Sequence, residues 1–219
     1  MRKWGEKLKG KVMKTYEIEL PEGYVEAKVV DAKNKQFAIV FNLIAVAVLV
    51  VTLVVTWFAL FSQFDEPFIE IVTKRIMSDN PWSNIIRIAV FALVLVAYVI
   101  LHELTHGLVY KLLTKQKLTF GLTLTVAYCG VPNIYLYRTA SLLAVIAPFA
   151  VFLPVFLIPM FFLTNYIDII LFAFMLAMHV GGCSGDLYNT FLYLIKFRDP
   201  STLMRDTGPK QTFYVKQKN

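Results

Sequence analysis

The chain has few charged residues and few cysteines for its length. Only 17% of its 219 residues are Asp, Glu, Lys or Arg, whereas 58% are hydrophobic, and the mean hydropathy is +0.61. This composition excludes an ordinary soluble domain and indicates a polytopic membrane protein. The two cysteines, Cys129 and Cys183, are too few for a disulfide framework and lack the paired spacing of a zinc ribbon. We interpret both as reduced thiols.

Other absences narrow the class of protein further. The sequence has no internal repeat, low-complexity tract or flexible Gly/Ser linker, so we expect one domain. Its net charge of +7 does not form a basic helix or a basic patch with interleaved aromatics, so nucleic acid is not an expected partner. A polar segment precedes the first apolar run, and no small-residue cleavage site follows that run. We therefore expect no removable signal peptide.

Four apolar runs are each long enough to cross a hydrocarbon core of about 30 Å. They cover about residues 37–61, 83–113, 139–163 and 167–197. Lys and Arg number nine in residues 1–36, two in the first loop, three in residues 114–139, none between the last two runs and five in residues 198–219. The positive-inside rule places both termini and the middle loop in the cytosol. We expect a cytoplasmic N-terminal segment, 1–36, a membrane catalytic domain, 37–197, and a cytoplasmic tail, 198–219.

The loop after the second run has the pattern of a β-structure. Residues 118–128 alternate between apolar and small polar side chains, residues 129–133 form a break, and residues 134–137 are typical of a second strand. A hairpin exposed to lipid would leave backbone groups unpaired, so this one must lie at the interface or line a hydrated cavity. Phe213, Tyr214 and Val215 form a further candidate strand. The expected fold is an all-α polytopic membrane protein with four transmembrane helices and a small β-hairpin or sheet at the cytoplasmic interface.

The second apolar run contains His102, Glu103 and His106 in the order His-Glu-Leu-Thr-His. On a helix the i,i+4 spacing brings the two imidazoles onto one face, where they can bind one divalent metal, with Glu103 within reach of a metal-activated water. Ionisable side chains within an apolar helix are costly and usually functional. The motif predicts a metal site, and two His with a carboxylate make zinc the natural first choice.

A catalytic zinc typically takes three protein ligands. No glutamate follows Glu103, so the third ligand must come from a small set: His179, Asp168, Asp186, Asp199, Asp206 and the two cysteines. Depth favours Asp186, because His102 and Asp186 each lie roughly 28 Å along their spans from the outer surface. Asp168 would lie at that outer surface, and Asp199 and Asp206 belong to the tail.

His179 is the second choice for this role. It lies seven residues before Asp186, on the same helical face and about 10 Å nearer the middle of the membrane. We interpret it as a runner-up metal ligand, a residue that supports the ligands or a residue that handles protons. Asn133 and Asn189 are candidates for holding the oxyanion or the substrate backbone.

These features resemble the site-2 protease type of intramembrane zinc metalloprotease, and more narrowly short bacterial membrane proteins described as "putative zincin peptidases". The likeness covers about residues 84–197. It implies that His102, His106 and Asp186 hold Zn²⁺ while Glu103 acts as general base on the water. It also implies that the hairpin at 118–137 takes up an extended membrane-protein or membrane-peptide substrate by strand addition. The active site would lie toward the cytosolic side of the cell membrane.

The sequence also departs from that family. The glycine-rich segment 182–186 replaces the Asn-Pro-Asp-Gly-like setting of the third ligand, and a PDZ-like insertion is lacking.

Two other functions compete with proteolysis. A catalytically silent membrane adaptor could bind metal without Glu103, so the presence of Glu103 argues against it. A metal transporter or sensor would need acidic or histidine side chains in several spans, whereas the first and third spans contain none. We therefore favour the protease.

Overall fold

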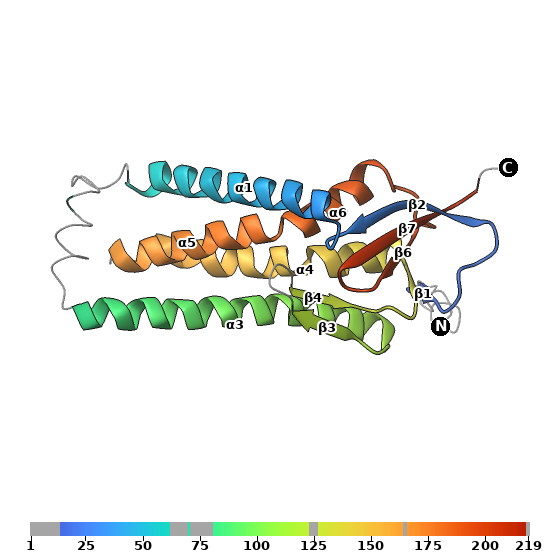
Figure 1. Cartoon of the computed structure of the whole chain (residues 1–219), viewed down its shortest axis with the longest axis horizontal. Coiled ribbons are helices and arrows are strands. Elements are labelled where there is room, and N and C mark those ends of the chain that lie inside the picture. The colour runs from blue at the N-terminus through green and yellow to red at the C-terminus, as the bar shows by residue number, and fades with distance from the viewer. Residues whose placement is uncertain (1–13, 62–69, 71–80, 123–126, 164–165, 218–219) are drawn as a thin grey trace, which may run out of the picture.

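The computed structural model describes residues 14–61, 70, 81–122, 127–163 and 166–217. Within these residues a bundle of long helices occupies one end of the molecule and a small sheet the other (Figure 1). The helices are α1 (Lys35–Phe61), α3 (Pro81–Thr114), α4 (Arg138–Leu157) with the 3₁₀ turn η2 (Ile158–Phe161), α5 (Tyr166–Gly182) and α6 (Ser184–Ile195). The apolar runs of the sequence therefore correspond to helices.

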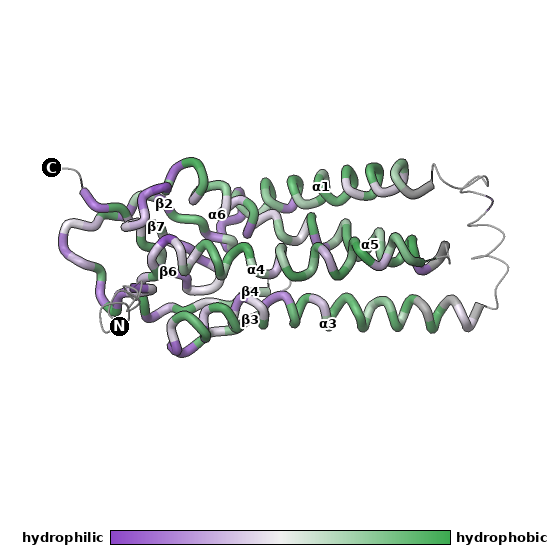
Figure 2. Tube along the Cα trace, turned by 180° about the vertical axis from the view of Figure 1, so that it is seen from behind, coloured by the Kyte–Doolittle hydropathy of each residue, from purple (hydrophilic) through white to green (hydrophobic). Residues whose placement is uncertain are grey.

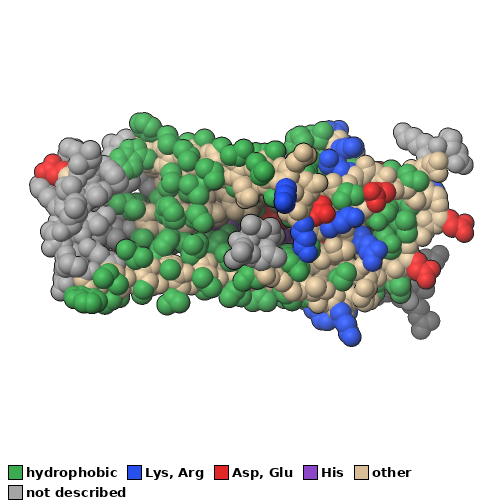
Figure 3. All heavy atoms as spheres, in the orientation of Figure 1, with side chains coloured by type: hydrophobic (Ala, Val, Ile, Leu, Met, Phe, Trp, Pro, Cys, Tyr) green, Lys and Arg blue, Asp and Glu red, His purple; other side chains and the backbone are tan. Residues whose placement is uncertain are grey.

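Three of these helices are long and apolar enough to cross a membrane: Lys35–Ala59, Ile88–Thr114 and Arg138–Phe161. A fourth crossing is added if α5 and α6, which are bent by 49° at Cys183, count as one span. The helical end is hydrophobic along its length in Figure 2, and in Figure 3 most Lys and Arg side chains gather toward the sheet end. This distribution suits a membrane protein whose sheet lies outside the hydrocarbon core.

The larger sheet has five strands in the order β1-β5-β6-β7-β2, and every neighbouring pair is antiparallel. Its strands are β1 (Tyr16–Glu17), β2 (Tyr24–Asp31), β5 (Tyr135–Tyr137), β6 (Leu203–Asp206) and β7 (Lys210–Lys216). A separate two-stranded sheet pairs β3 (Thr119–Leu122) with β4 (Ala127–Gly130). The larger sheet therefore joins both ends of the described chain to the middle loop.

The strand pairing expected for residues 118–137 is wrong. Residues 118–128 do not form one strand that pairs with 134–137, because this segment folds back on itself as β3 and β4. Tyr135–Tyr137 pairs instead with β1 and β6. Directly after β4, the Val131 amide donates a hydrogen bond of 2.9 Å to the Asp206 carbonyl. The residues between β4 and β5 are thus tied to the C-terminal segment.

The C-terminal segment packs into the core and is more than a polar tail. Phe213 of β7 is fully buried, stacks on Phe197 with a 4.7 Å centroid distance, and contacts Tyr193 of α6. Leu203 and Met204 of β6 are also fully buried. The candidate strand at residues 213–215 is part of β7, whereas β6 and β2 were not expected from the sequence.

Two glycines with positive φ allow a test of how closely the β6–β7 turn is packed. Gly208 has φ +97°, and a Cβ there would collide with the Tyr128 ring, whereas Gly23 has φ +77° and open space around it. Gly23→Ala should cost only the left-handed backbone penalty, about 1–2 kcal/mol. Gly208→Ala should cost a further 1–3 kcal/mol or so for overpacking. Denaturant unfolding of both variants measures the difference, and equal losses would contradict the close packing.

Candidate metal centre

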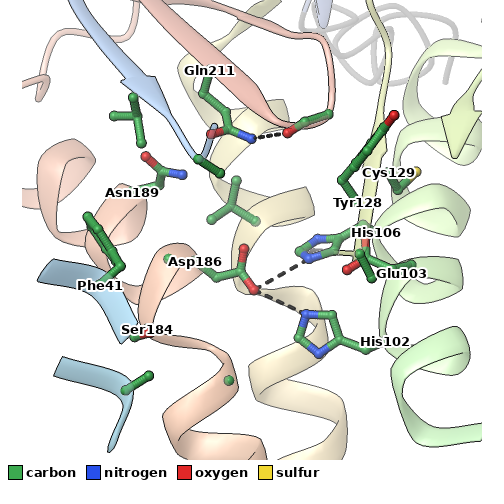
Figure 4. A pocket seen from close by; sticks show the side chains of 18 of the residues that line it. Phe41, His102, Glu103, His106, Tyr128, Cys129, Ser184, Asp186, Asn189 and Gln211 are labelled. Carbon is green, nitrogen blue, oxygen red and sulfur yellow. Dashed lines mark hydrogen bonds and ion pairs between the residues drawn. The ribbon is translucent and has the colours of Figure 1, made fainter. Parts of the chain in front are cut away.

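A cavity of about 410 Å³ lies where the helices meet the sheets (Figure 4). Its walls come from α1, α3, the α5–α6 break, β4 and the β6–β7 hairpin, with Phe41, Glu103, Tyr128, Asn189 and Gln211 among its lining residues. Three of the residues singled out from the sequence, His102, His106 and Asp186, also line it. Elements from the whole length of the described chain therefore build one site.

His102 and His106 lie one turn apart on α3 and face Asp186 across the cavity (Figure 4). One carboxylate oxygen, Asp186 Oδ2, is 3.2 Å from His102 Nε2 and 3.4 Å from His106 Nε2. Both histidines are at least 91% buried. Asp186 reaches this position because the chain bends at Cys183 and places it in the first turn of α6, where the unpaired amides of a helix N-terminus favour a carboxylate.

The tautomer of His106 follows from the hydrogen bond of Nδ1, the ring nitrogen that does not face Asp186. His106 Nδ1 lies 2.8 Å from the carbonyl oxygen of Ala144, and because a carbonyl can only accept, Nδ1 carries the hydrogen. That carbonyl is available because the residue four positions later, Pro148 within α4, has no N–H to donate to it. The Nε2 atom of the neutral ring therefore presents a lone pair to Asp186.

The donor set fits a divalent metal. An imidazole lone pair and a carboxylate oxygen that face each other repel unless a positive charge, from protons or a metal ion, lies between them. The two Nε2–Oδ2 distances, 3.2 and 3.4 Å, agree with the separation of about 3.3 Å expected between ligand atoms of a tetrahedral zinc with bonds of about 2.0–2.1 Å. His102, His106 and Asp186 are one of two groups in the described chain whose ligand atoms all lie within 4.8 Å of one another.

His179 lies on the other side of His102. It belongs to the second such group, with His102 and Cys183, and not to the group that contains Asp186. Its ring is fully buried, with Nδ1 2.8 Å from the Tyr98 hydroxyl and Nε2 3.4 Å from the Phe149 carbonyl. The structure therefore separates the runner-up ligand from the cluster that faces the cavity.

The other residues expected at the site divide into those that line the cavity and one that does not. Glu103 lies next to His106 in the cavity (Figure 4). Asn189 also lines it, and its buried Oδ1 has no hydrogen-bond partner in the described part of the chain. Asn133 is exposed in the turn before β5 and does not line the cavity. Only one of the two asparagines is therefore placed to contact a ligand.

Sequence reasoning missed Asp206, which it assigned to the tail. Asp206 is 97% buried at the end of β6 and lines the same cavity. Its carboxylate accepts hydrogen bonds from the Tyr110 hydroxyl (2.6 Å), the Gly208 amide (2.8 Å) and the Gln211 amide (3.3 Å). Tyr110 follows His106 by one helical turn, so Asp206 links the metal-site helix to the β6–β7 hairpin. Only pairing with β7 reveals this position.

Burial raises the pKa of Asp206 from its ordinary value of 3.8 to about 6, although the hydrogen bonds from Tyr110, Gly208 and Gln211 and the nearby His106 oppose the shift. Because the folded-state pKa is the higher one, Asp206 contributes stability below about pH 4 that is lost as pH rises to about 6. The free energy of unfolding should fall by about 3 kcal/mol over that window. Denaturant unfolding at several pH values should show this fall in the wild type and a smaller one in Asp206→Asn. An identical fall in both would contradict it.

Comparison with known families agrees with this chemistry. Residues 95–201 match the model of a family described as "Putative zincin peptidase". The matched segment contains His102, Glu103, His106 and Asp186. The match covers just under half of the chain, so it is a likeness to this family, whose description implies a zinc metallopeptidase. No curated protein and no solved structure matches the chain.

Proposed function

We propose that the protein is an intramembrane zinc metalloprotease of the site-2 protease type, which hydrolyses peptide bonds in or next to membrane segments of its substrates. The observation that carries this proposal is the convergence of His102 Nε2, His106 Nε2 and Asp186 Oδ2 in a cavity that also contains Glu103. The cavity lies at the junction of apolar helices and sheets, which suits a substrate at or near the membrane surface.

Each residue has a distinct role in the proposed reaction. His102, His106 and Asp186 would hold zinc. As a Lewis acid, zinc would lower the pKa of a bound water toward about 7 and polarise the scissile carbonyl. Glu103 accepts the proton of the attacking water and delivers it to the leaving amine. The Ala144 carbonyl keeps the His106 ring oriented through Nδ1. Only Glu103 transfers protons in this scheme.

Two features support an extended peptide as substrate. Ala127, Tyr128 and Cys129 of β4 line the cavity, and within the described residues β4 pairs only with β3, so a peptide could add along its other edge. The unpartnered Asn189 Oδ1 can accept a substrate backbone N–H. Main-chain recognition of this kind requires that a substrate helix is first unwound locally.

The proposed topology has four crossings, with the bent pair α5 and α6 as the fourth. Its cytosolic side is the sheet end, because the flanks richest in Lys and Arg, residues 1–36 and 198–219, contribute strands there. The partners would be lipid and a membrane-protein or membrane-peptide substrate. This orientation gives the active site access to water from the cytosol.

The experiment that tests the proposal compares the wild type with Glu103→Gln for cleavage of membrane proteins and for bound zinc. Loss of cleavage with zinc retained is the expected result. A wild type that binds zinc but cleaves nothing would favour the silent adaptor, and metal flux across vesicles without cleavage would favour a transporter.

A further inference from the structure

A chain of hydrogen bonds extends from His102 away from the cavity. Tyr98, one turn before His102 on α3, has its hydroxyl 3.3 Å from His102 Nδ1 and 2.8 Å from His179 Nδ1. His179 Nε2 in turn lies 3.4 Å from the carbonyl oxygen of Phe149 on α4. Three helices, α3, α5 and α4, therefore contribute to one line of contacts that runs from His102 to the Phe149 carbonyl.

The Phe149 carbonyl, at the end of this line, determines which atom donates and which accepts in every hydrogen bond of the line. The Phe149 carbonyl can only accept, so His179 Nε2 carries a hydrogen and Nδ1 of the neutral ring carries a lone pair. The Tyr98 hydroxyl must then donate to His179 Nδ1, which leaves its oxygen to accept from His102 Nδ1. His102 is thereby held with its hydrogen on Nδ1 and its lone pair on Nε2, the atom that faces Asp186.

Among the described residues, aromatic rings make up most of the surroundings of this chain. His179 is fully buried, and its ring packs against those of Phe149, Phe152 and Phe156 at centroid distances of 5.7, 6.1 and 5.7 Å. Tyr98 is 92% buried and packs edge-on against Phe152 and Phe156. Cys183 Sγ lies 3.5 Å from His179 Nδ1. A thiol is a weak donor, so this contact also agrees with a lone pair on His179 Nδ1.

We propose that His179 and Tyr98 are positioning residues, which fix the tautomer and orientation of His102 so that its Nε2 is ready to bind the metal. The inference rests on the proposed function, because it assumes that His102 is a metal ligand. In this assignment His179 does not bind the metal but acts through Tyr98 on His102, which does. The two metal-site histidines are then fixed by different devices, since His106 uses a carbonyl that Pro148 leaves free.

The first test is zinc affinity, measured on the full-length protein in detergent by competition with a chromogenic chelator. Tyr98→Phe removes the acceptor for His102 Nδ1–H, and His179→Leu frees the Tyr98 hydroxyl to donate to His102 in the wrong direction. Each should weaken zinc binding roughly 10- to 100-fold, the usual effect of losing the partner of a metal-binding histidine. The double variant should be no weaker than Tyr98→Phe alone, because both changes act through one chain.

Two further variants separate hydrogen bonding from packing. His179→Asn keeps an acceptor for Tyr98 and a donor, so it should recover most of the affinity that His179→Leu loses. Phe156→Leu alters the packing of both rings but no hydrogen bond, and should stay within about 2- to 3-fold of the wild type because it leaves the ligand orientation intact. An affinity loss in Phe156→Leu equal to that in His179→Leu would show a merely structural role.

The second test reads the tautomer directly. The chain contains only three histidines, so ¹⁵N-histidine NMR of the zinc-free protein can be assigned with one substitution at each. We expect His102 protonated on Nδ1 in the wild type and a mixture of tautomers in Tyr98→Phe. A wild-type His102 that carries its only hydrogen on Nε2, with none on Nδ1, would overturn the proposal, whatever the affinities.

The outcomes also distinguish this inference from the function on which it rests. If the wild type binds no zinc, or His106→Ala binds it as tightly as the wild type, the proposed function fails. If zinc binds and is lost in His106→Ala, but Tyr98→Phe and His179→Leu keep wild-type affinity, only the positioning role fails. A second zinc per chain that is lost in Cys183→Ser would make His179 a ligand and overturn the proposal.

Discussion

Replacing Glu103 with glutamine is expected to abolish peptide hydrolysis while zinc stays bound. Glutamine has nearly the same shape but cannot accept the proton of the attacking water, and the candidate metal-binding atoms of His102, His106 and Asp186 are untouched. General-base catalysis typically contributes about 10²- to 10⁴-fold to a rate, so cleavage should fall by at least that range. The zinc content should remain that of the wild type.

The measurement compares cells that produce wild type or Glu103→Gln at equal levels, by mapping new protein termini in the membrane fraction. Glu26→Gln is the matched control, because Glu26 is exposed on β2 and does not line the cavity. Fragments present with the wild type and with Glu26→Gln, but absent with Glu103→Gln, are the expected pattern. A Glu103→Gln variant that still cuts a wild-type substrate at the full rate would rule out the protease.

Asp186→Ala is expected to lose zinc almost completely. The substitution removes the carboxylate oxygen on which both Nε2 atoms converge and leaves two neutral imidazoles without a third ligand. The loss of affinity should exceed about 100-fold, the upper end of what the outer hydrogen-bond partners of a metal site contribute. Cleavage should disappear with the metal.

Metal analysis and chelator competition on the purified variant provide the measurement. Asp168→Asn is the control, because Asp168 is an exposed carboxylate in the first turn of α5, outside the cavity. It should bind zinc like the wild type. If Asp186→Ala kept its zinc while a variant of His179 lost it, the third ligand would be His179.

The sequence contained enough information to group the three residues of the candidate metal site, because their placement depends on local rules. Spacing along one helix places His102 and His106 together, and the rise per residue brings Asp186 to the same depth as His102. Helices that cross a membrane have nearly fixed length and direction, so depth can be read from position in the chain. The structure brings these three residues together as that reasoning anticipates.

The walls of the site could not be derived in the same way. β2 pairs with β7, so Tyr24 lies opposite Lys216, and no local pattern in a short strand names a partner so far along the chain. Asp206 looked like a polar residue of the tail, and only the pairing of β6 with β7 places it in the cavity. Asn133 was a candidate for holding the oxyanion or the substrate backbone, but it is exposed in the turn before β5, which joins a different sheet from the one expected. Tyr98 gave no signal, since one tyrosine in an apolar helix is unremarkable.

The long-range closure of the five-stranded sheet has a consequence for the biogenesis of the protein. The ribosome releases α1, α3 and α4 before it has made β6 and β7, and contacts between distant segments form late. A nascent chain that has just completed α6 already carries His102, His106 and Asp186. It still lacks the hairpin that contributes Asp206, Gly208 and Gln211 to the cavity. The cluster of His102, His106 and Asp186 therefore gains its full walls only after the C-terminal strands have paired.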